Sequence, residues 1–446
     1  MTPAGRLAAA IEILEQAEAE PGRLDRVMSR YFRARRYAGS GDRAAVAARV
    51  WRVVRSRCRL DWWAGRLGAD VSARTRVLAD LALVDGLDST SAAPLFAGTP
   101  HAPPPPSHGE RRLLDWLCGA GPGHPDMPAP VRAECPDWIA NRLEPVLGDR
   151  FAACMAALGR EAGLDLRINP LNGTGRFAVR RRLERAGLAT SPTPWSPLGL
   201  RCDGRPRVRG IAALRDGLVE IQDEGAQLAA LLTGVEPGMQ VADFCAGAGG
   251  KTLVLGALMR NRGRVLALDV SAARLDRAAA RVARAGLHNV ERRVLGGDAD
   301  RYTRRHRGRF DRVLVDAPCT GIGAWRRAPD ARQRYGETDL AGILATQDAI
   351  LARAARLTRP GGRLIYVTCS LLAEENEERV AALLRRRCDY RVLPVGDVWS
   401  ATVAARGGGV LPRAGADMLR LDPDGFGTDG FFVAVLERRA DALAST

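Results

Sequence analysis

Two cysteines directly follow predicted strands in the second half of the sequence. Cys319 follows the strand expected over Arg309–Asp316, in an Asp-Ala-Pro-Cys motif, and Cys369 follows the strand expected over Arg363–Thr368, in a Thr-Cys-Ser motif. Ligands of open α/β sheets bind at the carboxyl ends of the strands, so both thiols are expected to face one crevice. A free cysteine is otherwise most often a small, buried apolar side chain. That interpretation is given to Cys58, Cys118, Cys135, Cys154, Cys202 and Cys388.

A glycine-rich loop precedes both cysteines in the chain. The strand expected over Gln240–Phe244 runs into Cys-Ala-Gly-Ala-Gly-Gly-Lys-Thr and then into a helix, which places closely approachable backbone beside the positive end of that helix. The loop is not a phosphate-binding loop, because a cysteine stands where the first glycine of Gly-x-x-x-x-Gly-Lys-Thr would be. It holds the only lysine among 67 Lys and Arg residues, and an arginine does not replace a compact ammonium. A ligand is expected to approach the backbone of this loop closely.

Acidic residues follow the next two expected strands. Asp269 stands 22 residues past Gly247, close to the spacing at which an acid binds ribose hydroxyls, and Asp298 follows the third strand. Either acid alone could be a solvated turn or a helix cap. A glycine loop and two acids at three successive strand ends favour a nucleoside ligand instead. S-adenosylmethionine fits better than a dinucleotide, because it has an adenosine and a cationic sulfonium but no phosphate. We expect Asp269 and Asp298 to contact it.

A thiol beside S-adenosylmethionine indicates methylation of carbon 5 of a pyrimidine. Carbon 5 is too poor a nucleophile to take a methyl group directly, but a thiolate that adds to carbon 6 makes it enamine-like. A carboxyl group near ring nitrogen 3 and the amine would stabilise the developing charge, and Asp316 is the candidate. A base then removes the carbon 5 proton and the thiol is expelled, a step that a second cysteine could assist. The target base must first be unstacked, which favours RNA loops or single strands.

Regular alternation of strands and helices is expected from about residue 238 onward. The expected strands are Gln240–Phe244, Arg264–Asp269, Val290–Leu295, Arg309–Asp316, Arg363–Thr368 and Phe431–Leu436. The expected helices are Thr252–Met259, Ala272–Ala285, Leu340–Leu357 and Glu374–Arg386. Alternation of this kind predicts an α/β fold with a mostly parallel, doubly wound sheet.

The first half of the chain has a different residue pattern. Residues 1–93 are expected to form an all-helical domain, because valines recur at helical spacing as a buried stripe. Arginines on another side of the same helix are either an RNA-contacting face or an ordinary solvated face, and the pattern does not separate the two. They are Arg49, Arg52, Arg55 and Arg59. A Pro/Gly-rich linker with a short helix is expected over 94–136, exposed and semi-rigid in its Pro-rich part. A small, arginine-rich α+β RNA-binding domain is expected over 137–215.

The composition excludes several classes of protein. The formal net charge of +16 favours a polyanionic partner, nucleic acid first, although an arginine excess also follows from a codon-biased genome. The sequence has no run of 18 apolar residues, and glutamates interrupt its first 19 residues, so neither a membrane span nor a signal peptide is expected. Nine cysteines without a Cys-x-x-Cys spacing favour neither disulfides nor structural zinc. We expect a cytoplasmic protein without a metal and without an obligate protein partner.

With these motifs the chain resembles the Nop/Sun family of RNA cytosine-5 methyltransferases, and within it the bacterial ribosomal RNA type known as RsmB or Sun. The family pattern Cys-Ala-x-x-Gly-Gly-Lys-Thr is matched at Cys245–Thr252 and Asp-Ala-Pro-Cys at Asp316–Cys319. Thr-Cys-Ser is matched at Thr368–Ser370 and is followed by a Glu-Glu-Asn helix. The resemblance covers about residues 160–436.

The resemblance implies roles that the residues alone leave open. It makes Cys369 the nucleophile and Cys319 the residue that aids product release, whereas sequence reasoning alone also allows the reverse. It puts Lys251 near the target base or its backbone. It also implies that the cofactor is contacted by Cys245, Ala246, Gly247, Ala248, Gly249, Gly250, Lys251, Asp269, Asp298 and Asp316. It further implies a Rossmann-like, S-adenosylmethionine-dependent methyltransferase domain over 216–438, followed by a tail at 439–446.

The N-terminal helices loosely resemble NusB-like RNA-binding domains, through Arg35-Arg36 and the segment 39–43. This favours ribosomal over transfer RNA as the substrate. Ala328 follows two arginines where the family often has His or Asn, so one polar contact of the substrate loop is expected to be missing. The alternatives are a transfer RNA methyltransferase, a non-catalytic RNA-binding ribosome-assembly factor, and a DNA or small-molecule methyltransferase.

Overall fold

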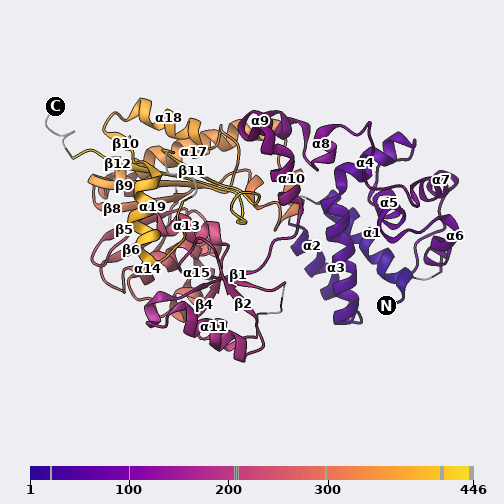
Figure 1. Ribbon diagram of the computed structural model, residues 1–446, viewed down its shortest axis with the longest axis horizontal. Coiled ribbons are helices and arrows are strands. Elements are labelled where there is room, and N and C mark those ends of the chain that lie inside the picture. The colour runs from indigo at the N-terminus through magenta and orange to yellow at the C-terminus, as the bar shows by residue number, and fades with distance from the viewer. Residues whose placement is uncertain are drawn as a thin grey trace. The chain divides into compact units, whose positions relative to one another are not determined.

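The chain folds into two compact units. The computed structural model describes residues 1–20, 23–99, 101–204, 206, 208, 210–296, 299–411 and 416–440. The first unit comprises Met1–Arg160 with Arg327–Glu337, and the second comprises Glu161–Arg326 with Thr338–Thr446 (Figure 1). The first unit therefore takes in a short segment that follows the Asp-Ala-Pro-Cys motif.

The described part of the first unit is helical, as the sequence predicts for residues 1–93. Its helices are α1 (Pro3–Ala19), α2 (Leu24–Ala34), α3 (Ser40–Arg55), α4 (Arg57–Arg66), α5 (Ala73–Asp85), α6 (Ser89–Ala92), α7 (His108–Leu117), α8 (Ala129–Arg132), α9 (Asp137–Leu147) and α10 (Phe151–Gly159). The core is apolar, with Ile13, Leu78 and Leu114 fully buried. Burial of these side chains is the main favourable contribution to folding.

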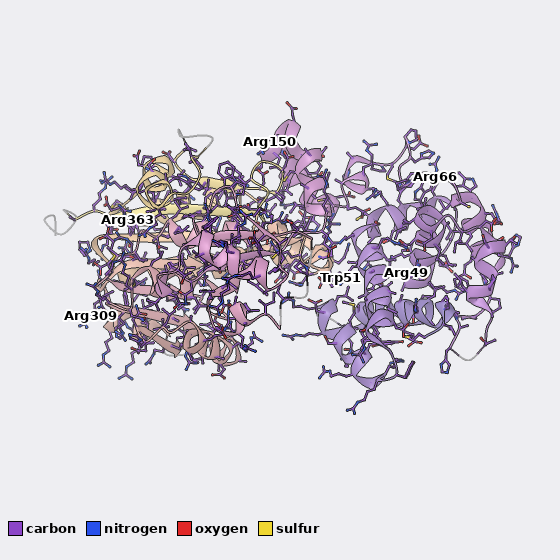
Figure 2. All side chains as sticks on the ribbon, turned by 60° about the horizontal axis from the view of Figure 1, so that its bottom comes forward. Arg49, Trp51, Arg66, Arg150, Arg309 and Arg363 are labelled. Carbon is purple, nitrogen blue, oxygen red and sulfur yellow. The ribbon has the colours of Figure 1, made fainter. Side chains whose placement is uncertain are left out.

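The arginines of α3 and α4 fit neither of the two interpretations that the sequence offers. Arg49 Nη1 lies 2.8 Å from Asp80 Oδ2, and Arg52 Nε lies 2.6 Å from Asp80 Oδ1. Asp80 is only 1% exposed, and both arginines also reach Asp85. Arg59 pairs with a buried glutamate of the same unit. These guanidinium groups therefore connect helices within the unit, because a buried carboxylate requires a charged partner. Figure 2 shows arginines on both units, among them Arg66 on the first and Arg309 on the second.

The Pro-rich segment is less exposed than predicted. Phe96 is 1% exposed, and Pro103 and Pro106 are buried. Arg74 donates from Nη2 to the Pro104 carbonyl at 2.9 Å. The segment folds back on its own unit because burial of the large Phe96 side chain stabilises that arrangement more than exposure of the segment to solvent would.

The second unit begins with a small antiparallel sheet. Its strands are β1 (Asp165–Ile168), β2 (Thr190–Pro192), β3 (Gly199–Cys202) and β4 (Val219–Ile221), in the order β2-β3-β1-β4. Helix α11 (Arg176–Arg185) buries Val179 and Leu183 against it, and α12 (Ala212–Arg215) precedes β4. The sequence predicts a small α+β domain over 137–215, but α9 and α10 of that range belong to the first unit and β4 lies beyond its end, because the sheet is completed by a strand later in the chain. Its apolar residues belong to the same hydrophobic core as those of the large sheet, so the two parts of this unit pack as one body.

A large sheet of eight strands forms the rest of the second unit. Its order is β10-β12-β9-β8-β5-β6-β7, with β11 paired to β12. The strands are β5 (Gln240–Phe244), β6 (Arg264–Asp269), β7 (Val290–Val294), β8 (Phe310–Asp316), β9 (Thr358–Thr368), β10 (Tyr390–Val392), β11 (Leu419–Leu421) and β12 (Phe431–Arg438). Neighbours from β9 to β7 are parallel, whereas β10, β11 and β9 pair with β12 antiparallel. The predicted mostly parallel sheet is confirmed.

Helices cover both faces of this sheet (Figure 1). One face packs on α16 (Ala299–Arg305), α17 (Glu337–Leu357) and α18 (Glu377–Arg386). The other packs on α13 (Glu224–Leu231), α14 (Gly250–Leu258), α15 (Ala272–Arg284) and α19 (Val395–Thr402). None of the helices among the described residues has the length and apolar character required to cross a membrane.

Several differences from the predicted elements lie between residues 374 and 421. The sequence predicts a helix from Glu374, but α18 begins at Glu377, so the Glu-Glu-Asn motif lies in the turn before it. Both Glu375 and Asn376 are fully buried there and bind neighbouring strand ends. Strands β10 and β11 were not predicted, because three residues are too few for a periodic pattern. Cys388 is exposed, contrary to the expectation of a buried apolar side chain.

Candidate active site

The carboxyl ends of four neighbouring strands meet at one edge of the large sheet. Phe244 of β5 is in register with Leu268 of β6 and Val315 of β8, and Asp316 is in register with Val367 of β9. The residues that follow these positions therefore come together although the chain separates them widely. A cavity of about 630 Å³ opens at this edge, a size typical of small-molecule sites.

The glycine loop forms one wall of this cavity. Of its residues, Cys245, Ala246, Gly247, Ala248, Gly250 and Lys251 line the space. Gly247 and Gly249 adopt positive φ angles of 57° and 80°, which permits the tight turn into α14. Gly249 does not line the cavity but is needed for packing, because a Cβ there would lie 3.0 Å from the Cβ of Ala278. Cys245 has a φ of 92°, an uncommon value for a residue with a side chain.

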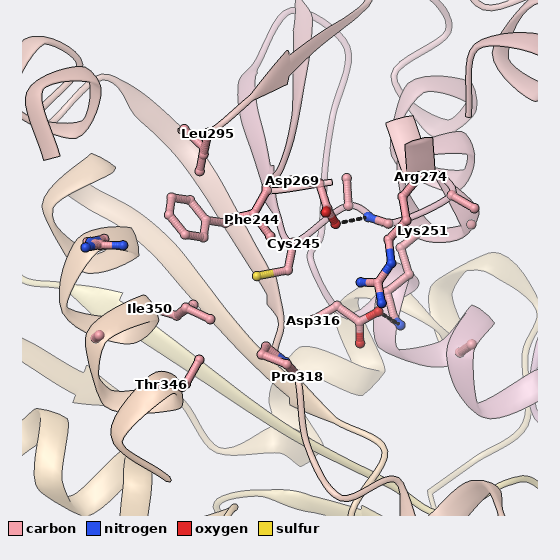
Figure 3. A pocket seen from close by; sticks show the side chains of 18 of the residues that line it. Phe244, Cys245, Lys251, Asp269, Arg274, Leu295, Asp316, Pro318, Thr346 and Ile350 are labelled. Atoms are coloured by element: carbon pink, nitrogen blue, oxygen red, sulfur yellow. Dashed lines mark hydrogen bonds and ion pairs between the residues drawn. The ribbon is translucent and has the colours of Figure 1, made fainter. Parts of the chain in front are cut away.

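Asp269 binds the loop from the next strand. Its Oδ2 accepts a hydrogen bond from the Gly247 amide at 2.8 Å, and its Oδ1 accepts one from the Ser271 amide at 2.8 Å. The carboxylate thus fixes the loop and keeps further lone pairs available. In Figure 3 it lies beside the cavity, whose other side is formed by Phe244, Leu295 and Ile350.

Lys251 and Asp316 form an ion pair at the edge of the cavity (Figure 3). Lys251 Nζ lies 2.7 Å from Asp316 Oδ2 and 5.3 Å from the centre of the Phe431 ring. Burial alone would lower the pKa of Lys251, but the charge and hydrogen bond of Asp316, together with Cys369, raise it above its usual value. Lys251 therefore remains a buried ammonium, while the Asp316 side chain is 36% exposed to the cavity.

The two cysteines at the ends of β8 and β9 lie side by side. Cys319 Sγ lies 3.3 Å from Cys369 Sγ, and both residues are half-buried. The hydrogen bond to Cys369, together with burial, raises the pKa of Cys319 well above its usual value. Cys319 therefore keeps its proton, and either sulfur can be the donor in the contact between the two. The two thiols are thus adjacent, as expected for strand ends at one edge of the sheet, although neither cysteine lines the cavity of about 630 Å³.

Two buried residues just before α18 hold both cysteine segments. Glu375 accepts hydrogen bonds from the Thr320 amide at 2.8 Å and from its hydroxyl at 2.5 Å. The Asn376 side chain accepts from the Thr368 hydroxyl at 2.5 Å and donates to the Ser370 carbonyl at 3.0 Å. The residues that flank each cysteine are thus connected to one turn. From the sequence alone this motif is expected only as the start of a helix.

Asp243 is a second site feature that the sequence analysis missed. It is 1% exposed within β5, and its Oδ2 accepts a 2.6 Å hydrogen bond from Thr252. Its Oδ1 has no hydrogen-bond partner among the described residues. Burial raises its pKa to about 7, and the nearby charges of Asp316 and Asp269 act in the same direction. An acid in the middle of a short apolar strand was the available signal, since such a residue is seldom buried without a reason.

The structure brings together most of the predicted site. The glycine loop, Asp269, Asp316, Cys319 and Cys369 gather at one end of the sheet. Asp298, predicted to contact the cofactor, lies outside the described residues. Within the described part of the chain, no group of histidine, cysteine or acidic residues is arranged to hold a metal ion.

Comparison with known proteins places these features in a family. The family model described as 16S rRNA methyltransferase RsmB/F matches residues 230–437, and that of the RsmF/B-like ferredoxin-like domain matches residues 135–209. A ribosomal RNA small subunit methyltransferase B from Xylella fastidiosa is 35% identical over 308 residues, which are 68% of this chain and 67% of that protein. The chain belongs to the RsmB/RsmF family of 16S rRNA methyltransferases.

Other relatives agree with this membership. A probable ribosomal RNA small subunit methyltransferase B from Synechocystis is 32% identical over 306 residues, 68% of this chain and 66% of that protein. The matched region thus spans about two thirds of these relatives. The crystal structure of PH0851 shares the fold, with a TM-score of 0.77 over 98% of this chain and 99% of that one, at 24% identity.

S-adenosylmethionine is the cofactor of this RsmB/RsmF methyltransferase, and the cavity has groups that suit it. Apolar side chains on one side can take a purine ring, and Asp269 can take ribose hydroxyls. The first amides of α14 have no acceptor inside their own helix, so they can bind a carboxylate. The cavity volume and the absence of side chains on the loop glycines let the cofactor approach the backbone of the loop closely.

Proposed function

We propose that the protein transfers the methyl group of S-adenosylmethionine to carbon 5 of a cytosine in RNA, with small-subunit ribosomal RNA as the favoured substrate. The observation that carries the proposal is the pair of thiols, 3.3 Å apart, at the edge of the sheet that holds the cofactor cavity. One sulfur forms a transient bond to the cytosine ring, and the other then helps to break that bond and release the product. Relatives named ribosomal RNA small subunit methyltransferase B support the choice of RNA.

Cys369 is the nucleophile in this scheme. Its sulfur attacks carbon 6 of the cytosine ring, which shifts the electrons of the carbon 5–carbon 6 double bond toward the ring nitrogen and the amine. Cys319 keeps its proton in the resting site, because its pKa is raised by the neighbouring sulfur and by burial. Its S–H group supports negative charge on the attacking sulfur.

Asp316 and Lys251 act on the ring and its charge. A carboxyl group near ring nitrogen 3 and the amine hydrogen-bonds the side of the ring on which charge develops. Asp316 is exposed to the cavity enough to do this, and the Lys251 ammonium at 2.7 Å fixes its orientation. S-adenosylmethionine, when bound, supplies the methyl group that carbon 5 accepts.

Cys319 completes the reaction. Once the Cys369 sulfur is bonded to carbon 6, it no longer forms the hydrogen bond that raises the pKa of Cys319 most. Cys319 then loses its proton to solvent and takes the proton from carbon 5. The electrons of that C–H bond re-form the carbon 5–carbon 6 double bond, and the bond from carbon 6 to sulfur breaks. Cys369 leaves as a thiolate, so both cysteines must be reduced, which suits the reducing cytoplasm.

The small α+β domain supplies one RNA-binding surface. Phe177 is 70% exposed on α11, and Arg181 and Arg185 follow it at helical spacing on the same exposed face. An aromatic ring can stack on an unpaired base while arginines contact phosphates. The arginines of α3 are instead occupied by acids of their own unit.

The first unit supplies a second RNA contact near the end of α2. Arg36 and Tyr37 are both exposed there, and Tyr37 is 67% exposed. This position corresponds to the Arg35-Arg36 segment on which the NusB-like resemblance depends.

A methylation assay tests the proposal. Purified protein with tritiated S-adenosylmethionine and unmodified small-subunit ribosomal RNA should give labelled 5-methylcytosine. Transfer RNA and DNA of matched length serve as competing substrates. RNA binding without methyl transfer would contradict the proposal and favour a ribosome-assembly factor. Preferred labelling of transfer RNA would show that transfer RNA is the substrate instead.

Cysteine variants test the chemistry. Cys369→Ser should abolish turnover, and Cys319→Ala should accumulate a covalent protein–RNA adduct that migrates slowly on a denaturing gel. The exposed Cys388→Ser is the matched control and should behave as the parent. An adduct that persists in the Cys319→Ala/Cys369→Ser double variant would show that another residue bonds to the base.

A further inference from the structure

The cofactor loop is held from outside the large sheet by a side chain of the small α+β domain. Arg167 lies on β1 and is 2% exposed. Its Nη1 donates to the Gly250 carbonyl at 3.0 Å and to Gln222 Oε1 at 2.5 Å. Gln222 follows β4 and itself lines the cofactor cavity.

This arginine lacks the partners that a buried charge usually has. No carboxylate among the described residues forms an ion pair with it, and its Nε has no hydrogen-bond partner there. Burial lowers the pKa of Arg167 to about 10. Keeping a guanidinium buried with only carbonyl and amide acceptors costs stability, so the position calls for a reason other than packing.

A second arginine holds the same loop in the same way. Arg281 of α15 donates from Nη1 to the Ala248 carbonyl at 2.7 Å. It is oriented by Glu220 of β4, which pairs with Arg281 at 3.1 Å and is the strand partner of Arg167. The carbonyls of Ala248 and Gly250, on either side of Gly249, are therefore each bound by an arginine. Each of these arginines in turn contacts a residue of β4 or the residue directly after it.

We propose that Arg167 is a positioning residue for the cofactor: by holding the Gly250 carbonyl, it fixes the turn from which the first amides of α14 bind S-adenosylmethionine. The small α+β domain is then a structural part of the cofactor site as well as an RNA-binding element. The inference rests on the cofactor site of the proposed function.

Another buried arginine offers a matched control. Arg312 of β8 is 8% exposed, and within the described part of the chain its guanidinium donates only to backbone carbonyls, those of Thr233 and Asp311. Its pKa is also lowered to about 10 by burial, with Arg363 adding to the effect. It does not line the cofactor cavity. Arg167→Met and Arg312→Met thus remove similar groups from similar surroundings.

The test is titration calorimetry of S-adenosylmethionine into full-length variants, followed by steady-state kinetics. Arg167→Met should weaken binding by roughly tenfold, the effect of one hydrogen bond to a charged donor, with kcat at saturating cofactor within about threefold of the parent. Arg167→Lys should recover part of the affinity, and Arg312→Met should bind as the parent does. Thermal unfolding of each variant shows how much stability is lost.

The outcomes separate the two proposals. Equal affinity in Arg167→Met and Arg312→Met overturns the positioning role. A parent protein that binds no S-adenosylmethionine overturns the proposed function itself. If Arg167→Met does not fold, Arg281→Met takes its place, because that side chain is less buried and holds the adjacent carbonyl. Unchanged cofactor affinity in Arg281→Met then counts against the inference.

Discussion

The two halves of the active site are anchored in different ways. The cofactor half, formed by residues 245–251 and Asp269, is held at its backbone: arginines bind its carbonyls, and an aspartate binds one of its amides. The cysteine half is held by the side chains of Glu375 and Asn376, which bind both hydroxyl groups and backbone groups of the residues next to each thiol. A cofactor bound by amides requires a fixed backbone, whereas chemistry at two sulfurs requires fixed strand ends. Each half is thus stabilised at the atoms that must not move.

The largest predicted effect is a fall in kcat when only the cysteine half is disturbed. Glu375→Gln keeps the size of the side chain but places an amide N–H₂ against the donors of Thr320. Displacement of a reacting group by about 1 Å costs on the order of 100-fold in rate, so kcat should fall by about that factor. The KM for S-adenosylmethionine should stay within about twofold. A rise in this KM without loss of kcat would show that the halves are not separate.

The converse prediction affects the cofactor half. In Asp269→Asn one amide donor must face either the Gly247 or the Ser271 N–H, because both carboxylate oxygens accept a hydrogen bond in the parent. The KM for S-adenosylmethionine should rise roughly tenfold, as expected for loss of a hydrogen bond to a charged group. The yield of the Cys319→Ala covalent adduct at saturating cofactor should not change. Steady-state kinetics and a denaturing gel measure the two effects.

A smaller effect is expected at the RNA surface, which belongs to neither half. Phe177→Ala removes an exposed ring, and loss of one stacked base costs about 1–3 kcal/mol. The KM for RNA should rise about tenfold, while that for S-adenosylmethionine is unchanged. Leu95→Ala, which trims a half-buried side chain of the first unit, is a control for general loss of stability. Unaltered RNA affinity in Phe177→Ala would place the contact elsewhere.

The smallest predicted effect is a pH dependence of stability that arises from Asp243, the buried acid within β5. Burial raises the pKa of Asp243 to about 7, so the folded protein holds a proton there that the unfolded chain releases near pH 4. The stability that this proton provides is present below pH 4 and is lost as the pH rises toward and through 7. Asp243→Asn cannot ionise, so its melting temperature relative to the parent should increase by a few degrees between pH 5 and pH 8. A constant difference across that range would contradict the raised pKa.

Much of the second unit could be predicted from the sequence because its elements are long and strongly patterned. The alternation after residue 238 predicts five of the parallel strands to within a few residues, although β9 begins earlier than expected. The Cys-Ala-x-x-Gly-Gly-Lys-Thr and Thr-Cys-Ser motifs locate the loop and the thiols, since such chemistry depends on residue type. The arginines of α3 could not be interpreted in the same way. Whether an arginine faces solvent or a buried Asp80 depends on a helix some 30 residues further along the chain.

The sequence alone determined which reactive groups the protein has and the order of elements that carries them to one edge of a sheet. Only the tertiary structure decided how far apart the two sulfurs lie and which groups fix them. It also decided that an arginine of the small domain would reach Gly250. Parallel pairing brings strand ends together whatever lies between them, so local patterns suffice for the first result. Hydrogen bonds between residues 50 or 80 positions apart leave no periodic trace, and only the folded chain reveals them.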